Sequence, residues 1–242
     1  MNLKISLIGA GSAQFSLSLI RDLAQTPNLD GCTVSFMDID QDRLDTAIQL
    51  CQRYANEVGI GLNLEQTTDR RESLEDADFV INTALILGNT RMYEGIQLAQ
   101  KLGYRFGGSY HIMHDEPFWV NYYQFKFFEQ ITEDILEICP QAWHLLVANP
   151  VLAGTTQLMR KYPQAKMIGL CHGYGGLFRV ADVLGLDKEG LTYELPGVNH
   201  FIWLTKAFYK GEDFFPFLDR WIEEKSAEYW KTCPVSDYMG PK

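Results

Sequence analysis

The sequence has no concentration of positive charge and no long apolar run. Its 242 residues include 21 lysines and arginines against 31 aspartates and glutamates, which gives a formal net charge of −10. We therefore expect no nucleic-acid partner and no anionic membrane surface as a partner. No segment reaches the roughly 18 apolar residues of a membrane span, and the first residues, MNLKISLIGAGS, lack the features of a signal peptide. These absences predict a cytoplasmic protein.

Cysteine is also scarce, and the five cysteines are scattered without a CxxC pair, so a disulfide framework is not expected. Most of them are interpreted as small buried side chains. Cys171 differs because His172 follows it in GLCHGYGG, at the end of an apolar run and the start of a glycine-rich turn. A thiolate there can be a metal ligand or a nucleophile, and the imidazole can act as an acid or base. A purely structural Cys-His pair is the alternative, and a metal site needs a second ligand.

Strand-length apolar runs alternate with helix-length segments, which predicts an α/β fold with a Rossmann-like, doubly wound parallel sheet. The expected strands are 3–8, 33–37, 62–66, 78–84, 143–149 and 166–171, and the main helices are 13–25, 42–58, 117–138 and 176–184. From residue 192 the pattern changes to an antiparallel pair that turns at Lys210 and Gly211. We predict a nucleotide-binding domain over residues 1–185 and the start of an α+β substrate domain over 186–242. Aromatic residues recur at helical spacing and are expected in the core: Trp119, Tyr122, Phe125 and Phe128.

The segment ISLIGAGSAQF predicts a strand, a glycine turn and a helix. Gly9 permits the tight turn, Gly11 permits close approach of a pyrophosphate, and Ser12 opens the helix whose amino end attracts an anion. The third glycine of the usual fingerprint is replaced by Gln14. Asp38, at the end of the second strand, is placed to accept the ribose hydroxyls of NAD rather than NADP. A turn and an aspartate without any ligand remain the alternative.

Two further strand ends carry polar side chains. Asn149 in VANPV can offer its amide to a ribose or sugar hydroxyl, although Asn-Pro is often only a turn. In GVNHFIW, His200 can supply the second metal ligand with Asn199 beside it, and the competing interpretation is a core histidine. Cys171 and His200 alone would leave most coordination positions open, as a catalytic metal requires.

The order of these segments resembles glycoside hydrolase family 4, whose members require NAD and a divalent metal. The segments are GAGS, MDID, ANPV, GLCHG and GVNHFIWLTK. The resemblance implies that Cys171 and His200 bind Mn²⁺, that Asn149 contacts the substrate near the metal, and that His172 is an acid for the leaving group. A histidine after the metal cysteine, where phosphoglycoside-specific relatives carry aspartate, points to non-phosphorylated α-glucuronides or α-galacturonides.

The family mechanism that the resemblance implies is oxidation at C3 by NAD, metal-assisted elimination and addition of water, an exception to the usual pair of carboxylates. Arg91 and Asn199 are candidates for binding the substrate. Family members are much longer than this chain, so the tyrosine base is expected beyond the chain's end, with Tyr238 the candidate within it. A homo-oligomer is expected at full length. The alternatives are a 2-hydroxy acid dehydrogenase, whose arginine set is not found, and a non-catalytic NAD-binding module.

Overall fold

The computed structural model describes residues 3–86, 94, 97–98, 100–103, 118–171, 175–198 and 201–232. The contacts divide the chain into two compact units, Met1–Leu170 and Cys171–Lys242.

The first unit contains a six-stranded parallel sheet in the order β3-β2-β1-β4-β5-β6. Its strands are β1 (Lys4–Ile8), β2 (Thr33–Met37), β3 (Asn63–Thr67), β4 (Phe79–Asn82), β5 (Trp143–Leu146) and β6 (Met167–Gly169). This order is that of the Rossmann dinucleotide-binding fold, in which the order reverses beside the first strand. The predicted α/β fold with a parallel sheet is therefore confirmed.

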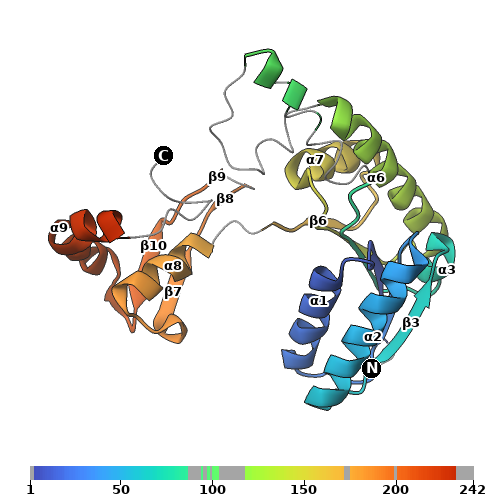
Figure 1. Cartoon of the computed structure of the whole chain (residues 1–242), viewed down its shortest axis with the longest axis horizontal. Coiled ribbons are helices and arrows are strands. Elements are labelled where there is room, and N and C mark those ends of the chain that lie inside the picture. The colour runs from blue at the N-terminus through green and yellow to red at the C-terminus, as the bar shows by residue number, and fades with distance from the viewer. Residues whose placement is uncertain are drawn as a thin grey trace. The chain divides into compact units, whose positions relative to one another are not determined.

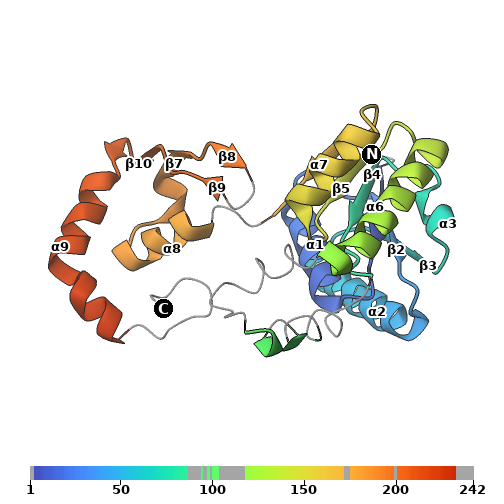
Figure 2. The same cartoon turned by 90° about the horizontal axis from the view of Figure 1, so that it is seen from above.

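Helices cover both faces of this sheet (Figure 1). They are α1 (Ala13–Gln25), α2 (Gln41–Val58), α3 (Arg70–Leu74), α6 (Phe118–Ile138) and α7 (Val151–Lys161). Figure 2 shows α1 and α2 on one side, with α6 and α7 on the other. Because parallel strands bury both faces, inner strands are mainly apolar, as in KISLI of β1, whereas the edge strand β3, NLEQT, is polar and mostly exposed. Ile5 and Leu7 pack toward α1 and α2, whereas Ile8 packs with Ile131 of α6.

The second unit is mixed α+β. Its elements are α8 (Gly175–Leu184), η1 (Lys188–Gly190), β7 (Leu191–Glu194), β8 (Gly197–Val198), β9 (Phe201–Ile202), β10 (Lys206–Tyr209), β11 (Glu212–Asp213) and α9 (Phe215–Thr232). Strand β10 pairs antiparallel with both β7 and β11, and Lys210 and Gly211 form the turn between β10 and β11 with φ of 50° and 87°. The predicted antiparallel turn is confirmed at this place, within three strands rather than two.

Helix α8 belongs to the core of the second unit, where Leu177 and Ala181 pack against Leu191, Ala207 and Phe214. The contacts therefore separate the chain after Leu170, whereas the sequence suggested a domain boundary after residue 185. The boundary between 1–185 and 186–242 stays a prediction about the folding domains. Among the helices in the described ranges, none is long and apolar enough to cross a membrane.

One buried side chain in the sheet is ionisable. His144 lies in β5 opposite Val80 of β4 and Met167 of β6, and it is 1% exposed. Within the described part of the chain, neither ring nitrogen has a hydrogen-bond partner. Burial disfavours the charged imidazolium and lowers the pKa of His144 from its ordinary value of 6.5 to about 4.

This burial predicts a pH-dependent stability. Between about pH 6.5 and pH 4 the unfolded chain binds a proton at His144 that the folded chain does not, so the free energy of unfolding falls as the pH falls. The full loss is about 3 kcal/mol for this group. Urea unfolding from pH 7.5 to 4 should show a shallower decline for His144→Leu than for the unmodified chain. Equal slopes for the two proteins would contradict the prediction.

Candidate functional site

The glycine turn after β1 is bonded to the end of β2. The backbone N–H groups of Gly9 and Ala10 both donate to the Met37 carbonyl oxygen, at 2.9 and 3.0 Å. Gly9 has φ of +92°, in the left-handed region that glycine adopts without strain. A Cβ at Gly9 would lie 2.8 Å from the backbone nitrogen of Ala84, so the position also lacks room for a side chain. Turn geometry and close packing both explain the glycine.

Asp38, the first residue after β2, is held against the same turn. Its Oδ2 accepts a hydrogen bond from the Gly11 N–H at 2.8 Å, and its Oδ1 accepts one from the Asp40 N–H at 3.2 Å. A Cβ on Gly11 would approach Oδ2 to 2.7 Å. The structure thus brings together Gly11 and Asp38, which the sequence analysis had placed in one site. A fixed, part-buried carboxylate at this strand end is suited to accept hydroxyl hydrogens of a ribose.

The start of α1 has no capping group of its own. Ser12 is the N-cap residue, yet its side chain makes no capping hydrogen bond, and the first turn contains no acidic residue. By contrast, α2 and α3 begin with Asp40 and Asp69, whose side chains accept from backbone N–H groups. The first N–H groups of a helix have no partner within the helix, and among the described residues the Ser12 side chain does not cap them here. These groups and the positive end of the helix dipole make the start of α1 a place where an anion is stabilised.

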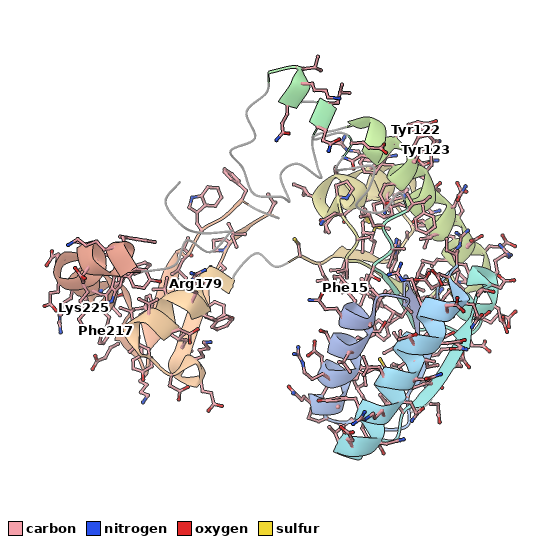
Figure 3. The ribbon with its side chains drawn as sticks, in the orientation of Figure 1. Phe15, Tyr122, Tyr123, Arg179, Phe217 and Lys225 are labelled. Carbon is pink, nitrogen blue, oxygen red and sulfur yellow. The ribbon has the colours of Figure 1, made fainter. Side chains whose placement is uncertain are left out.

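The position of the missing third glycine lies within α1. Gln14 is exposed, and Phe15, which Figure 3 labels on the first turn, is 50% exposed. The buried Ser16 donates from its hydroxyl to the Ala10 carbonyl at 2.7 Å and so ties the helix to the turn. Ser16 was not predicted from the sequence, because a serine four residues after Ser12 carries no motif signal.

A third strand end completes the surroundings of the turn. Thr83 follows β4, and its N–H and its hydroxyl both donate to the Ile8 carbonyl, at 2.9 and 3.0 Å. This brings Thr83 and Ala84 against Gly9. Neither residue was predicted as part of the site, although the polar pair Asn82 and Thr83 at the end of an apolar strand was an available signal.

The other predicted site residues are not part of the bonded cluster around the glycine turn. Asn149 is half-buried, follows β5 at the same carboxyl edge of the sheet, and precedes a cis peptide bond to Pro150. Cys171 is half-buried and is the first residue of the second unit. The remaining candidates lie outside the described residues: Arg91, His172, Asn199, His200 and Tyr238. In the described ranges no group of three or more His, Cys, Asp or Glu side chains could hold a metal, so the Cys171 and His200 site stays a prediction.

Three other cysteines are buried in the first unit, as expected from the sequence. Burial raises the pKa of the Cys51 and Cys139 thiols to about 11, and burial also raises the pKa of Cys32. Protonated thiols are poor nucleophiles and poor metal ligands. Cys32, Cys51 and Cys139 therefore contribute to packing rather than to chemistry.

The strand order, the glycine turn and the strand-end aspartate define a Rossmann-type architecture. A sequence model described as family 4 glycosyl hydrolase matches residues 4–186. The chain belongs to this family, as its motifs had suggested.

Curated relatives agree with this membership, and a solved structure shares the fold. An alpha-galactosidase of Bacillus subtilis is 28% identical over 235 residues, covering 92% of this chain and 51% of the relative. An alpha-galacturonidase of Lachnoclostridium phytofermentans is 27% identical over 246 residues, covering 94% and 50%. The structure of a 6-phospho-alpha-glucosidase from gut microorganisms, in complex with NAD and Mn²⁺, matches with a TM-score of 0.77 at 22% identity, covering 93% of this chain and 52% of that chain. The chain spans about half the length of the curated relatives it matches.

The packing of the turn against Ala84 predicts different costs for two glycines. Alanine at Gly31, which has φ of +82° and nothing within 4 Å of its Cβ, should lose only the roughly 1 to 2 kcal/mol of a left-handed backbone. Alanine at Gly9 should lose a further 1 to 3 kcal/mol, roughly, for steric overlap with Ala84. Urea unfolding of Gly9→Ala and Gly31→Ala measures the two losses in free energy of unfolding. Equal losses would show that the turn can move away from Ala84 without cost.

Proposed function

We propose that the protein is an NAD- and divalent-metal-dependent glycosidase that hydrolyses non-phosphorylated α-glycosides, with α-glucuronides or α-galacturonides as the substrate class. The observation that carries this proposal is the Asp38 carboxylate bonded to the Gly11 N–H beside the uncapped start of α1. Membership of family 4 adds the reaction class.

The residues of the first unit fit NAD. The N–H groups at the start of α1 would hold the pyrophosphate, and Gly11 leaves room for its approach. Asp38 would accept hydrogen bonds from the adenosine ribose, and its charge would repel the additional phosphate of NADP. When bound, NAD⁺ supplies a hydride acceptor for a sugar carbon. The solved structure with NAD bound has the same fold.

The donor set of Cys171 and His200 fits a divalent metal, because thiolate and imidazole are ligands for borderline first-row ions. Mn²⁺ is the proposed ion, as it is present with NAD in the 6-phospho-alpha-glucosidase structure. When bound, such an ion supplies Lewis acidity near the substrate oxygens. Asn149, at the carboxyl edge of the sheet, would hold a sugar hydroxyl there, with Asn199 as a second polar contact.

Three more residues have proposed roles in the substrate chemistry. His172 would donate a proton to the leaving group, and Tyr238 is the candidate base within this chain. Arg91 would bind a uronide carboxylate, since a guanidinium matches a carboxylate with two parallel hydrogen bonds. The uronide preference is also supported by the alpha-galacturonidase relative, whereas the alpha-galactosidase relative has a neutral sugar in its name. We propose a cytoplasmic location, supported by the free cysteines of the described residues, and a homo-oligomer at full length.

The nucleotide part of the proposal is tested by exchange of one carboxylate. Asp38→Asn should weaken NAD⁺ binding by about tenfold to a hundredfold, because hydrogen bonds from the ribose hydroxyls to a charged acceptor are lost. Discrimination against NADP⁺ should also shrink. Asp40→Asn is the matched control, since Asp40 caps α2 through the Arg43 N–H. Calorimetric titration of both nucleotides measures the effect, and unchanged affinity in Asp38→Asn would remove Asp38 from the site.

The glycosidase part requires turnover. Aryl α-glucuronide, α-galacturonide and α-galactoside are incubated with the protein, NAD⁺, Mn²⁺ and a thiol in D₂O, and proton NMR follows the released sugar. Hydrolysis of a uronide with deuterium at C2 is expected, and chelation or Cys171→Ser should abolish it. Asp38-dependent NAD⁺ binding without hydrolysis of any of the three would contradict glycosidase activity in this chain and favour a binding module.

A further inference from the structure

We propose that Gln124 of α6 is a positioning residue for the dinucleotide site, acting through the segment that follows β4. The proposal rests on the proposed function, because it assigns a residue to the same nucleotide site. Gln124 is 2% exposed and lies about forty positions along the chain from the segment that it contacts.

The side-chain amide of Gln124 binds the backbone of this segment in two directions. Its Nε2 donates to the Ala84 carbonyl oxygen at 2.8 Å, and its Oε1 accepts from the Ile86 N–H at 2.9 Å. One primary amide thus takes the place of the backbone of a neighbouring strand. Figure 3 shows Tyr122 and Tyr123 projecting outward from α6. These two residues are 52% and 57% exposed, whereas Gln124, on the same turn, is 2% exposed and faces inward.

Asn82 completes the arrangement from within the sheet. Its Oδ1 accepts from the Ala84 N–H at 3.1 Å, and the residue is fully buried. Ala84 and Ile86 follow the end of β4, where the regular pairing of the sheet has ended. Their hydrogen bonds to the two side-chain amides are part-buried, although Ile86 itself is 46% exposed, so the amides take the place of sheet partners. Asn82 and Gln124, which we call the amide pair, satisfy both polar groups of Ala84 and the N–H of Ile86. The path of residues 84–86 is therefore set by two side chains.

That path determines the position of the glycine turn. Ala84 lies so close to the turn that a Cβ on Gly9 would be only 2.8 Å from the Ala84 nitrogen. The Thr83 hydroxyl also donates to the Ile8 carbonyl, at 3.0 Å. Gly9 therefore has no space to move toward Ala84, and its N–H is bonded to β2 on the other side. If Gln124 no longer holds Ala84, one wall of the turn is released, and the N–H groups meant for the pyrophosphate lose their fixed place.

The experiment compares Gln124 of α6 with Gln157 of α7, which bonds a different residue of α6. Gln124→Met keeps the length of the side chain and removes both hydrogen bonds to residues 84–86. The control is Gln157→Met on α7, which removes the hydrogen bond from Gln157 Nε2 to Glu129 at 2.9 Å, away from the turn. Calorimetric titration should give a dissociation constant for NAD⁺ that rises about tenfold or more in Gln124→Met and changes less than about twofold in Gln157→Met.

A third variant separates positioning from general destabilisation. Gln124→Glu keeps the acceptor for the Ile86 N–H, but its ionised form offers no donor to the Ala84 carbonyl. Burial raises the pKa of such a carboxyl group, and the protonated acid regains the donor. The ratio of its dissociation constant to that of the unmodified protein should therefore fall as the pH is lowered from 8 to 5.5. This variant also serves if Gln124→Met does not fold.

The outcomes are distinct. Weakened binding in Gln124→Met with rescue of Gln124→Glu at low pH supports the proposal. Binding in Gln124→Met equal to that in Gln157→Met, or a ratio for Gln124→Glu that does not change with pH, overturns the role of Gln124 and leaves the proposed function intact. Absence of NAD⁺ binding in the unmodified protein overturns both.

Discussion

The carbonyl oxygen of Met37 is the acceptor on which the candidate site depends. It receives the N–H groups of both Gly9 and Ala10, so both of its lone pairs are used by one turn. This joins the end of β1 to the end of β2 directly, without a side chain that could rotate. Asp38 follows at once, and its carboxylate continues the same connection to Gly11. The spacing between the glycine turn and the acidic group is therefore fixed by backbone geometry rather than by side-chain packing.

On the other side of the glycine turn, the position of Ala84 depends on α6 through Gln124. Helix α6 is bonded to two neighbouring helices, α3 and α7. Arg70 and Arg71 of α3 form ion pairs with Asp134 and Glu137, with N–O distances of 2.5 Å for Arg70 and 2.6 Å for the Arg71–Glu137 pair. The Arg71–Glu137 pair is exposed and contributes little, whereas the side chain of Asp134 is largely buried. On the side of α7, Glu129 bonds Lys161, which lowers the pKa of Glu129. Together with the packing of Phe128 and Ile131 in the core, these contacts hold α6 in the orientation in which Gln124 faces inward.

The features that could be predicted from the sequence are those determined by residues that are close together in the chain. A strand, a two-glycine turn, a helix and an acidic residue at the next strand end follow one another within forty residues, and each has its own local signal. Gln124 has no such local signal, because its partners Ala84 and Ile86 are about forty residues away in the chain. Only the folded chain brings the glutamine amide to their backbone groups. Helical spacing was also a partial guide: Phe125 and Phe128 pack in the core, but Tyr122 is exposed, contrary to expectation. Spacing of three and four residues describes more than one face of a helix.

On the proposed function, sugar specificity arises from groups outside this framework. Two relatives with nearly the same identity to the chain, 28% and 27%, have names that differ in whether the sugar carries a carboxylate. The groups that the first unit fixes, namely the turn, Asp38 and the start of α1, are suited to a nucleotide and do not distinguish these sugars. Distinguishing them requires a group that binds the sugar carboxylate, such as a guanidinium, or a group whose binding is weakened when that carboxylate is missing. Such groups belong on the segments after the strands, where substitution does not disturb the sheet. On the proposed function, a nucleotide framework combined with different strand-end segments would account for one fold among glycosidases of different substrates.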